Sequence, residues 1–158
     1  MDFASRAVEH TGITVSDLGR ATDFWVNTLG FTLARQGHLT GEFAAGVTGV
    51  TGADISIAVV VAPGGHRVEL LQYNEPKDRL VLRPRPCDVG SVHLALTVDD
   101  IDAVFETVTR AGWEAARPPQ TMTEGPRAGT RFAYMRDMQD GTVLELIQPA
   151  ATSAAWAQ

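Results

Sequence analysis

The sequence is poor in cysteine, in basic residues and in long apolar runs. Its 158 residues include one cysteine, Cys87, which excludes an internal disulfide and a dithiol redox centre and fits a reducing compartment. The formal net charge is −6, whereas a nucleic-acid surface needs a clustered excess of Lys and Arg. The longest apolar run, 55–62, is interrupted by Ser56 and is too short to span a membrane. The first residues lack the apolar segment of a signal peptide. We therefore expect a cytoplasmic protein with neither nucleic-acid nor membrane partners.

Two pairs of segments in the chain resemble each other. Residues 9–18, EHTGITVSDL, resemble 92–101, VHLALTVDDI, and residues 68–72, VELLQ, resemble 144–148, LELIQ. The first pair is offset by 83 positions and the second by 76, a difference that loops of unequal length explain. Because both matches occur in the same order, the sequence indicates a tandem duplication.

Each copy has the same predicted order of elements, β-α-β-β-β. Apolar residues at helical spacing follow the candidate N-caps Ser16 and Asp99, and the helices end at Gly30 and Gly112, where a left-handed C-cap is favoured. The predicted strands are 8–15, 31–36, 55–62 and 67–73 in the first copy, and 91–98, 113–116, 130–136 and 142–148 in the second.

The predicted fold is therefore α+β, with two tandem βαβββ modules whose mixed or antiparallel sheets curve around one cavity. The first module covers 7–74 and the second 91–149. A proline-containing linker, 75–90, joins them, and a tail of small residues, 150–158, follows.

Strand alternation gives the repeated histidines and glutamates a common direction. In each copy the apolar side chains fall on one face, and His10 with Glu69, or His93 with Glu145, falls on the other. Taken singly, a strand histidine or glutamate is most often solvent-exposed. The matched set of two imidazoles and two carboxylates instead predicts one divalent metal ion, at about 2.0–2.3 Å from each ligand.

The chain resembles the vicinal oxygen chelate superfamily, which includes glyoxalase I, methylmalonyl-CoA epimerase, extradiol dioxygenases and bleomycin-resistance proteins. The resemblance covers roughly 7–149 and rests on the two repeated segments, the DFW and TLGF stretches after the first of them, and the RDMQDG turn before the last strand. It implies paired βαβββ modules that form a metal cup. It also implies that His10, Glu69, His93 and Glu145 are the metal ligands.

The resemblance also separates the activities within the family. Extradiol dioxygenases use two His and one Glu, whereas glyoxalase I-like isomerases show the two-His, two-Glu set found here. Acyl-CoA epimerases usually have glutamine in place of Glu69. An acyl-CoA epimerase is therefore less favoured but stays possible. Binding-only resistance proteins typically lack the ligands altogether.

No nucleophile elbow and no phosphate-binding loop accompanies these residues, so the metal is the expected source of chemistry. We expect an isomerase, epimerase or lyase that removes the proton α to a carbonyl of a small oxygen-chelating substrate, through a metal-stabilised enolate or enediolate. The resemblance favours Glu145 as the base, with Glu69 as its partner. The ion could be Ni, Co, Zn, Mn or Fe. An Fe(II) extradiol-type dioxygenase and a ligand-sequestering resistance-type protein are the alternatives.

Other polar residues are weaker candidates. Glu42 lies in a predicted long loop and is either an extra base or, more simply, solvated. Arg127 and Arg131 flank a loop that could cover the site, although exposed arginines are the plainer interpretation. His38 and His66 lack counterparts in the second copy and are interpreted as surface residues in a loop and a turn. We also expect a homodimer, because small modules with open sheet edges favour pairing.

Overall fold

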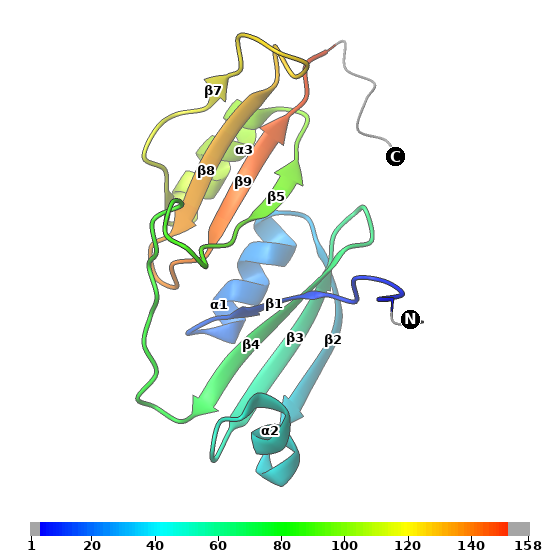
Figure 1. Ribbon diagram of the computed structural model, residues 1–158, viewed down its shortest axis with the longest axis vertical. Helices are drawn as coiled ribbons and strands as arrows, with labels where there is room; N and C mark the ends of the chain where they lie inside the picture. The colour runs from blue at the N-terminus through cyan, green and yellow to red at the C-terminus, as the bar shows by residue number, and fades with distance from the viewer. Residues whose placement is uncertain (1–3, 152–158) are drawn as a thin grey trace. The chain divides into compact units, whose positions relative to one another are not determined.

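A computed structural model of the protein describes residues 4–151 (Figure 1). The chain forms two compact units that divide between Leu80 and Val81. All but the first two residues of the predicted tail 150–158 lie outside the described part of the chain.

The first unit is a four-stranded mixed sheet. Its strand order is β1-β4-β3-β2, with β1 parallel to β4 and the other pairs antiparallel. The elements are β1 (Thr11–Thr14), α1 (Leu18–Asp23), the π-helical turn η1 (Phe24–Thr28), β2 (Thr32–Leu39), α2 (Gly41–Thr48), β3 (Asp54–Val61) and β4 (Arg67–Glu75).

The second unit repeats this plan. Its sheet has the order β5-β9-β8-β6, again with a parallel first pair, and β7 adds to β8. The elements are β5 (Leu94–Thr97), α3 (Ile101–Arg110), β6 (Trp113–Glu114), β7 (Gln120–Thr121), β8 (Arg131–Asp137) and β9 (Val143–Gln148). The predicted α+β fold, two βαβββ repeats with mixed sheets, is confirmed, and α2 and β7 are additions to it.

Several predicted boundaries were wrong by one to a few residues. The first strand of each unit has four residues instead of eight, so His10 and His93 each immediately precede a strand. The N-caps are Asp17 and Asp100 instead of Ser16 and Asp99. The carboxylate of Asp17 accepts from the Arg20 amide and that of Asp100 from two first-turn amides. Each carboxylate thus satisfies amides that the helix itself leaves without partners.

In each unit the helix covers the strand face opposite the glutamate. Val68 and Leu70 on β4 are fully buried, as are Leu144 and Leu146 on β9. Figure 1 shows α3 behind β8 and β9. The burial of alternate residues on β4 and β9 fixes the register, because a slip by one residue would exchange buried leucines for glutamates.

The glutamine that ends each repeated strand motif ties the strand to the helix. The side-chain oxygen of Gln72 accepts from the Leu18 amide at 2.7 Å, and that of Gln148 accepts from the Ile101 amide at 3.0 Å. Both amides belong to the first helical residue, which has no partner within its own helix. The repeated glutamine therefore fixes where the helix begins relative to the glutamate-bearing strand.

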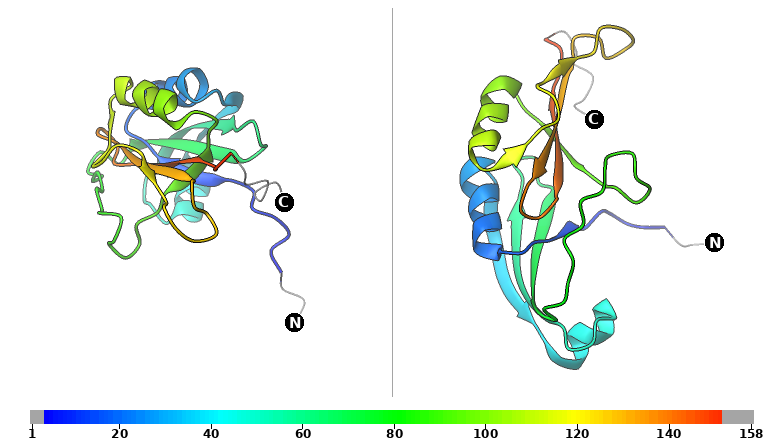
Figure 2. Two further views of the ribbon diagram at one scale, coloured as in Figure 1. Left: turned by 90° about the horizontal axis from the view of Figure 1, so that it is seen from above. Right: turned by 90° about the vertical axis from the view of Figure 1, so that its left-hand side faces the viewer.

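The opposite face of the first sheet is also partly covered, which the sequence analysis missed. Ile55, Ile57 and Val59 of β3 lie across from Tyr73, Leu71 and Glu69 of β4, and so share the glutamate face. They form a buried cluster with Ala44 of α2. Figure 2 shows α1 and α2 on opposite sides of this sheet. The predicted long loop that contains Glu42 thus includes a helix, α2, that closes a second core.

Replacing Gln148 with Ala tests the link between strand and helix. The change removes an acceptor from a partly buried amide, so we expect the free energy of unfolding to fall by about 1–2 kcal/mol. Gln36→Ala, on the exposed strand β2, is the control and should change it by less than about 0.5 kcal/mol. Urea denaturation measures both, and equal stabilities would contradict the assignment.

Candidate metal-ligand pairs

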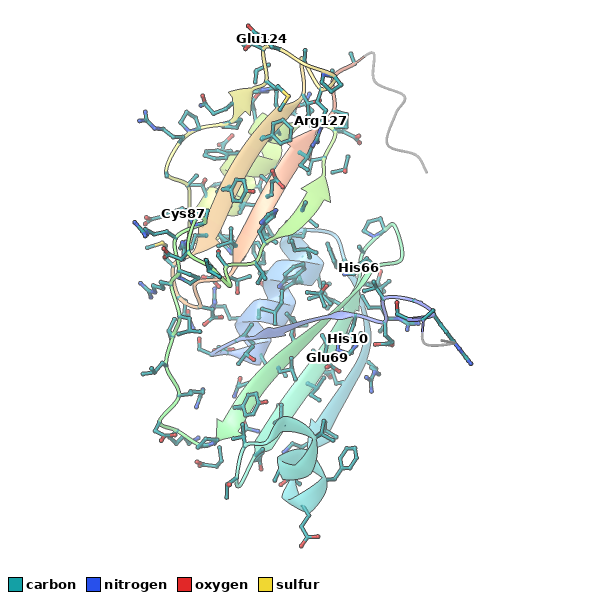
Figure 3. All side chains as sticks on the ribbon, in the orientation of Figure 1. His10, His66, Glu69, Cys87, Glu124 and Arg127 are labelled. Atoms are coloured by element: carbon teal, nitrogen blue, oxygen red, sulfur yellow. The ribbon has the colours of Figure 1, made fainter. Side chains whose placement is uncertain are left out.

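His10 and Glu69 lie side by side in the first unit (Figure 3). Gly12 of β1 is the parallel partner of Glu69 on β4, so His10, two residues earlier, lies on the same sheet face. The His10 Nε2 atom is 3.3 Å from a Glu69 carboxylate oxygen. The glutamate side chain is 13% exposed and the histidine 37%.

The second unit contains an equivalent pair. Ala95 of β5 is the parallel partner of Glu145 on β9, and His93 stands two residues before it. The His93 Nε2 atom is also 3.3 Å from a Glu145 oxygen, with side-chain exposures of 42% and 15%. The duplication has therefore preserved the distance and the degree of shielding as well as the residue types.

The geometry within each pair suits two ligands of one ion. Ligands about 2.0–2.2 Å from a first-row metal lie about 3.0–3.5 Å apart at tetrahedral or octahedral angles. The 3.3 Å separation falls within that range in both units. Imidazole nitrogen and carboxylate oxygen are also suitable donors for several divalent ions.

Glu9 orients the first histidine. Its carboxylate contacts the His10 Nδ1 atom, which leaves Nε2 directed at Glu69. The hydrogen bond from His10, together with Arg67 at 2.8 Å, holds the pKa of the Glu9 carboxyl below its usual value. A carboxylate behind a metal-binding histidine commonly fixes its tautomer and ring orientation. The sequence analysis missed Glu9, although it directly precedes the histidine.

Two further residues distinguish the surroundings of the two pairs. Arg35 of β2 places its Nη2 atom 3.4 Å from Glu69. Tyr134 of β8 lies directly opposite Glu145, and its ring packs edge-on against His93 with centroids 5.0 Å apart. Burial, and to a smaller extent the charge of Glu145, raises the pKa of the Tyr134 phenol. Neither residue belongs to the repeated segments, so the repeats gave no signal for them.

Between residues 4 and 151, no three His, Cys, Asp or Glu side chains gather closely enough to hold an ion. Each unit taken by itself supplies two candidate ligands. The four-ligand shell of His10, Glu69, His93 and Glu145 stays a prediction.

The secondary candidates have structural surroundings of their own. Glu42 is exposed on the first turn of α2 and not in a loop. His38 lies on β2 and contacts Asp54 at 2.8 Å, whereas the partly buried His66 contacts the Thr11 hydroxyl at 2.9 Å.

The two arginines of the second unit also have partners. Arg127 lies over the Phe132 ring at 4.7 Å. Arg131 forms a bidentate ion pair with Asp102 of α3 at 2.6 and 2.8 Å, so the interpretation of a freely exposed arginine was wrong there. This ion pair links β8 to the helix.

Comparison with known proteins identifies the family. The family described as the Glyoxalase/Bleomycin resistance protein/Dioxygenase superfamily matches residues 7–146. The chain belongs to this superfamily. The resemblance found in the sequence is thereby confirmed, and the match includes both His–Glu pairs.

Curated relatives include one protein named an epimerase and others named probable lyases. A 2-epi-5-epi-valiolone epimerase from Actinomyces is 34% identical over 89% of this chain and 78% of its own length. A probable lactoylglutathione lyase from Synechocystis is 30% identical over 90% of this chain and 95% of its own length.

Solved structures agree on the fold. A glyoxalase family protein from Bacillus cereus aligns with a TM-score of 0.80 at 24% identity, over 94% of this chain and 97% of its own. A superfamily domain from Frankia aligns with a TM-score of 0.65 at 22% identity, over 95% and 96% of the two chains. In the part of the chain that the structure describes, no helix is long and apolar enough to cross a bilayer.

A titration of Tyr134 tests the geometry of the second pair. In a Tyr73→Phe background Tyr134 is the one remaining tyrosine, and we expect its pKa to lie above the ordinary value of 10.0. Adding Glu145→Gln should lower that pKa part of the way back, because a negative charge that opposes phenolate formation is lost. Tyrosinate absorbance in metal-free protein measures both values, with circular dichroism as the check on folding. An unchanged pKa would place Glu145 away from the phenol.

Proposed function

We propose that the protein is a divalent-metal-dependent isomerase, epimerase or lyase. It moves the proton α to a carbonyl of a small substrate that presents two neighbouring oxygens. His10, Glu69, His93 and Glu145 would hold the ion, whether the two pairs belong to one chain or to two copies in a dimer.

One observation carries the proposal: the two His–Glu pairs match in spacing, exposure and position. Each pair has the same 3.3 Å separation, and each glutamate is largely shielded while its histidine is more open. Two neutral imidazoles and two carboxylates would leave a bound divalent ion close to electrical neutrality, which suits a shielded site. The duplication accounts for the equivalent positions, and the retention of the same four residue types beside neighbours that have diverged supports a shared task.

The relatives' names support the type of reaction. One relative is named an epimerase, and three are named probable lactoylglutathione lyases at 27–30% identity. A carboxylate that accepts and returns the proton on a carbon beside a carbonyl serves either kind of reaction. We therefore propose only the step that an epimerase and a lactoylglutathione lyase share, which is proton transfer on a carbon beside a carbonyl.

Glu145 and Glu69 divide the proton transfer. Glu145 would loosen from the ion to accept the α proton. Glu69, protonated from solvent, would return a proton from the other side of the substrate, and loss of the proton from Glu145 to solvent would restore the starting state. Tyr134, beside His93 and Glu145, shields this carboxylate and can donate a hydrogen bond to a substrate oxygen. A bound divalent ion would supply positive charge that stabilises the enolate.

His93→Ala tests the metal site. Loss of one ligand should lower metal affinity by about tenfold or more, since even outer-shell changes cost that much. Elemental analysis of protein purified without added metal, followed by titration with Co(II), measures it. His38→Ala and His66→Ala are the matched controls and should keep full occupancy, because neither residue belongs to a His–Glu pair. Full occupancy in His93→Ala, with an unchanged urea midpoint, would overturn the proposed shell.

Deuterium exchange tests the reaction. Incubation in D₂O with S-lactoylglutathione or 2-epi-5-epi-valiolone should introduce deuterium beside the carbonyl, as mass spectrometry detects. Glu145→Gln should slow the exchange by about 10²-fold or more, because the base is lost. Oxygen uptake with catechols by the iron-loaded protein, in the absence of any exchange, would instead establish the dioxygenase alternative.

A further inference from the structure

A cleft of about 290 Å³ opens beside His10 in the first unit. This volume is near the lower end of the range for small-molecule sites, so it accommodates one substituent of a substrate. Its walls combine two arginines with small apolar side chains and the Glu9–His10 dipeptide. The lining residues are Glu9, His10, Ala34, Arg35, Val59 and Arg67.

A β-bulge directs Arg35 toward Glu69. Strands β2 and β3 pair Leu33 with Val60, but Arg35 pairs with Val59, so Ala34 is the extra residue. Without the bulge, Arg35 would pair with Ala58 and project from the face that α1 covers. Val59 is in turn the partner of Glu69 on β4. Arg35, Val59 and Glu69 are therefore neighbours across three adjacent strands, on the sheet face that carries the His10–Glu69 pair. Bulges commonly redirect a side chain next to a functional site.

The two arginines of the cleft differ in how firmly they are paired. Arg67 donates to Glu9 at 2.8 Å, and Glu9 also contacts His10. Arg35 has a longer contact, 3.4 Å, to Glu69, and 67% of its side chain is exposed. Most of the guanidinium donors of Arg35 therefore face the solvent of the cleft. If Glu69 binds an ion, its carboxylate is less available to Arg35.

We infer that Arg35 binds an oxyanion, a carboxylate or a phosphate, carried by the substrate next to its chelating oxygens. This inference rests on the proposed function, because it takes Glu69 to be a metal ligand. A planar guanidinium matches the geometry of an oxyanion and forms two charge-assisted hydrogen bonds with it. The small side chains of Ala34 and Val59 leave room for that group.

Within the described residues of the second unit, β6 places no arginine beside Glu145. Strand β6 pairs Glu114 with Arg136 and ends there, before the row that contains Tyr134 and Glu145. The cleft beside Tyr134, about 330 Å³, is walled by apolar side chains and prolines together with Arg117 and Gln120. Arg35, unlike Arg117, contacts a candidate ligand, Glu69 at 3.4 Å, so the oxyanion is assigned to Arg35.

Matched ligand pairs test the inference on Co(II)-loaded protein. Dihydroxyacetone and dihydroxyacetone phosphate share a hydroxyketone and differ by the phosphate. The keto acids 2-oxobutyrate and 2-oxoglutarate differ by a distal carboxylate. Calorimetric titration of the wild type should show about tenfold to a hundredfold tighter binding of the member with the additional anionic group in at least one pair. The pair that shows the preference identifies the anion.

Arg35→Gln should reduce this preference to about threefold or less and leave the affinity for the member without the additional anionic group unchanged. Arg35→Lys should retain part of it, because charge remains while the planar fork is lost. Arg67→Gln removes the same charge from the same cleft and is the matched control. It should keep most of the preference, since Arg67 is already paired with Glu9.

The outcomes separate the inference from the proposed function. An unchanged preference in Arg35→Gln, or an equal loss in Arg67→Gln, would overturn the role of Arg35 and leave the metal site standing. A lower Co(II) affinity in Arg35→Gln, with both members of a pair weakened equally, would reduce Arg35 to a residue that positions Glu69. Failure of the wild type to bind Co(II) would overturn the proposed function itself.

Discussion

The parallel pairing of the first and last strands in each unit is the constraint on which the candidate site depends. Side chains alternate between the two faces of a sheet, and in a parallel pair directly opposed residues project from the same face. A histidine just before one strand therefore lies beside a glutamate within the adjacent parallel strand. Gly12 opposite Glu69 and Ala95 opposite Glu145 are small, and neither side chain obstructs the histidine. The buried leucines on the other face hold this register.

The helix that follows the first strand makes the parallel connection possible. Parallel strands need a crossover, and the amphipathic helix provides it while covering the apolar face. Gln72 and Gln148 then join the end of the glutamate-bearing strand to the first helical amide. In each unit the glutamate-bearing strand, the helix and the His–Glu pair thus depend on one another. All three occur together in both copies of the repeat.

The sequence predicted this repeated unit well because its signals are local. Alternation along residues 68–72 and 144–148 fixed the two faces, and the predicted glycines Gly30 and Gly112 do adopt positive φ angles of 74° and 92°. The caps were misplaced by one residue because Ser16 and Asp17 are both good capping residues. Only the geometry of the turn selects Asp17.

The parts that escaped prediction depend on contacts between distant segments. Helix α2 contains Gly41, Gly46 and Thr48, which are weak helix formers, and its burial of Ala44 against β3 compensates for them. The continuous apolar run of β3 could have indicated a strand covered on both faces. The bulge at Ala34 leaves no comparable trace, since it is defined by the register of two strands and not by the composition of either.

The proposed two-sided proton transfer is consistent with two similar His–Glu pairs in unequal surroundings. One ion held as proposed would need similar donors from both repeats, and His10–Glu69 and His93–Glu145 have kept the same separation. A substrate, in contrast, presents different groups to its two sides. A permanent cation stands beside Glu69, whereas an aromatic ring with a phenol stands beside Glu145. The two units therefore differ on the neighbouring strands, where β2 carries Arg35 and β8 carries Tyr134. Changes at these positions would alter substrate recognition and leave the two His–Glu pairs intact.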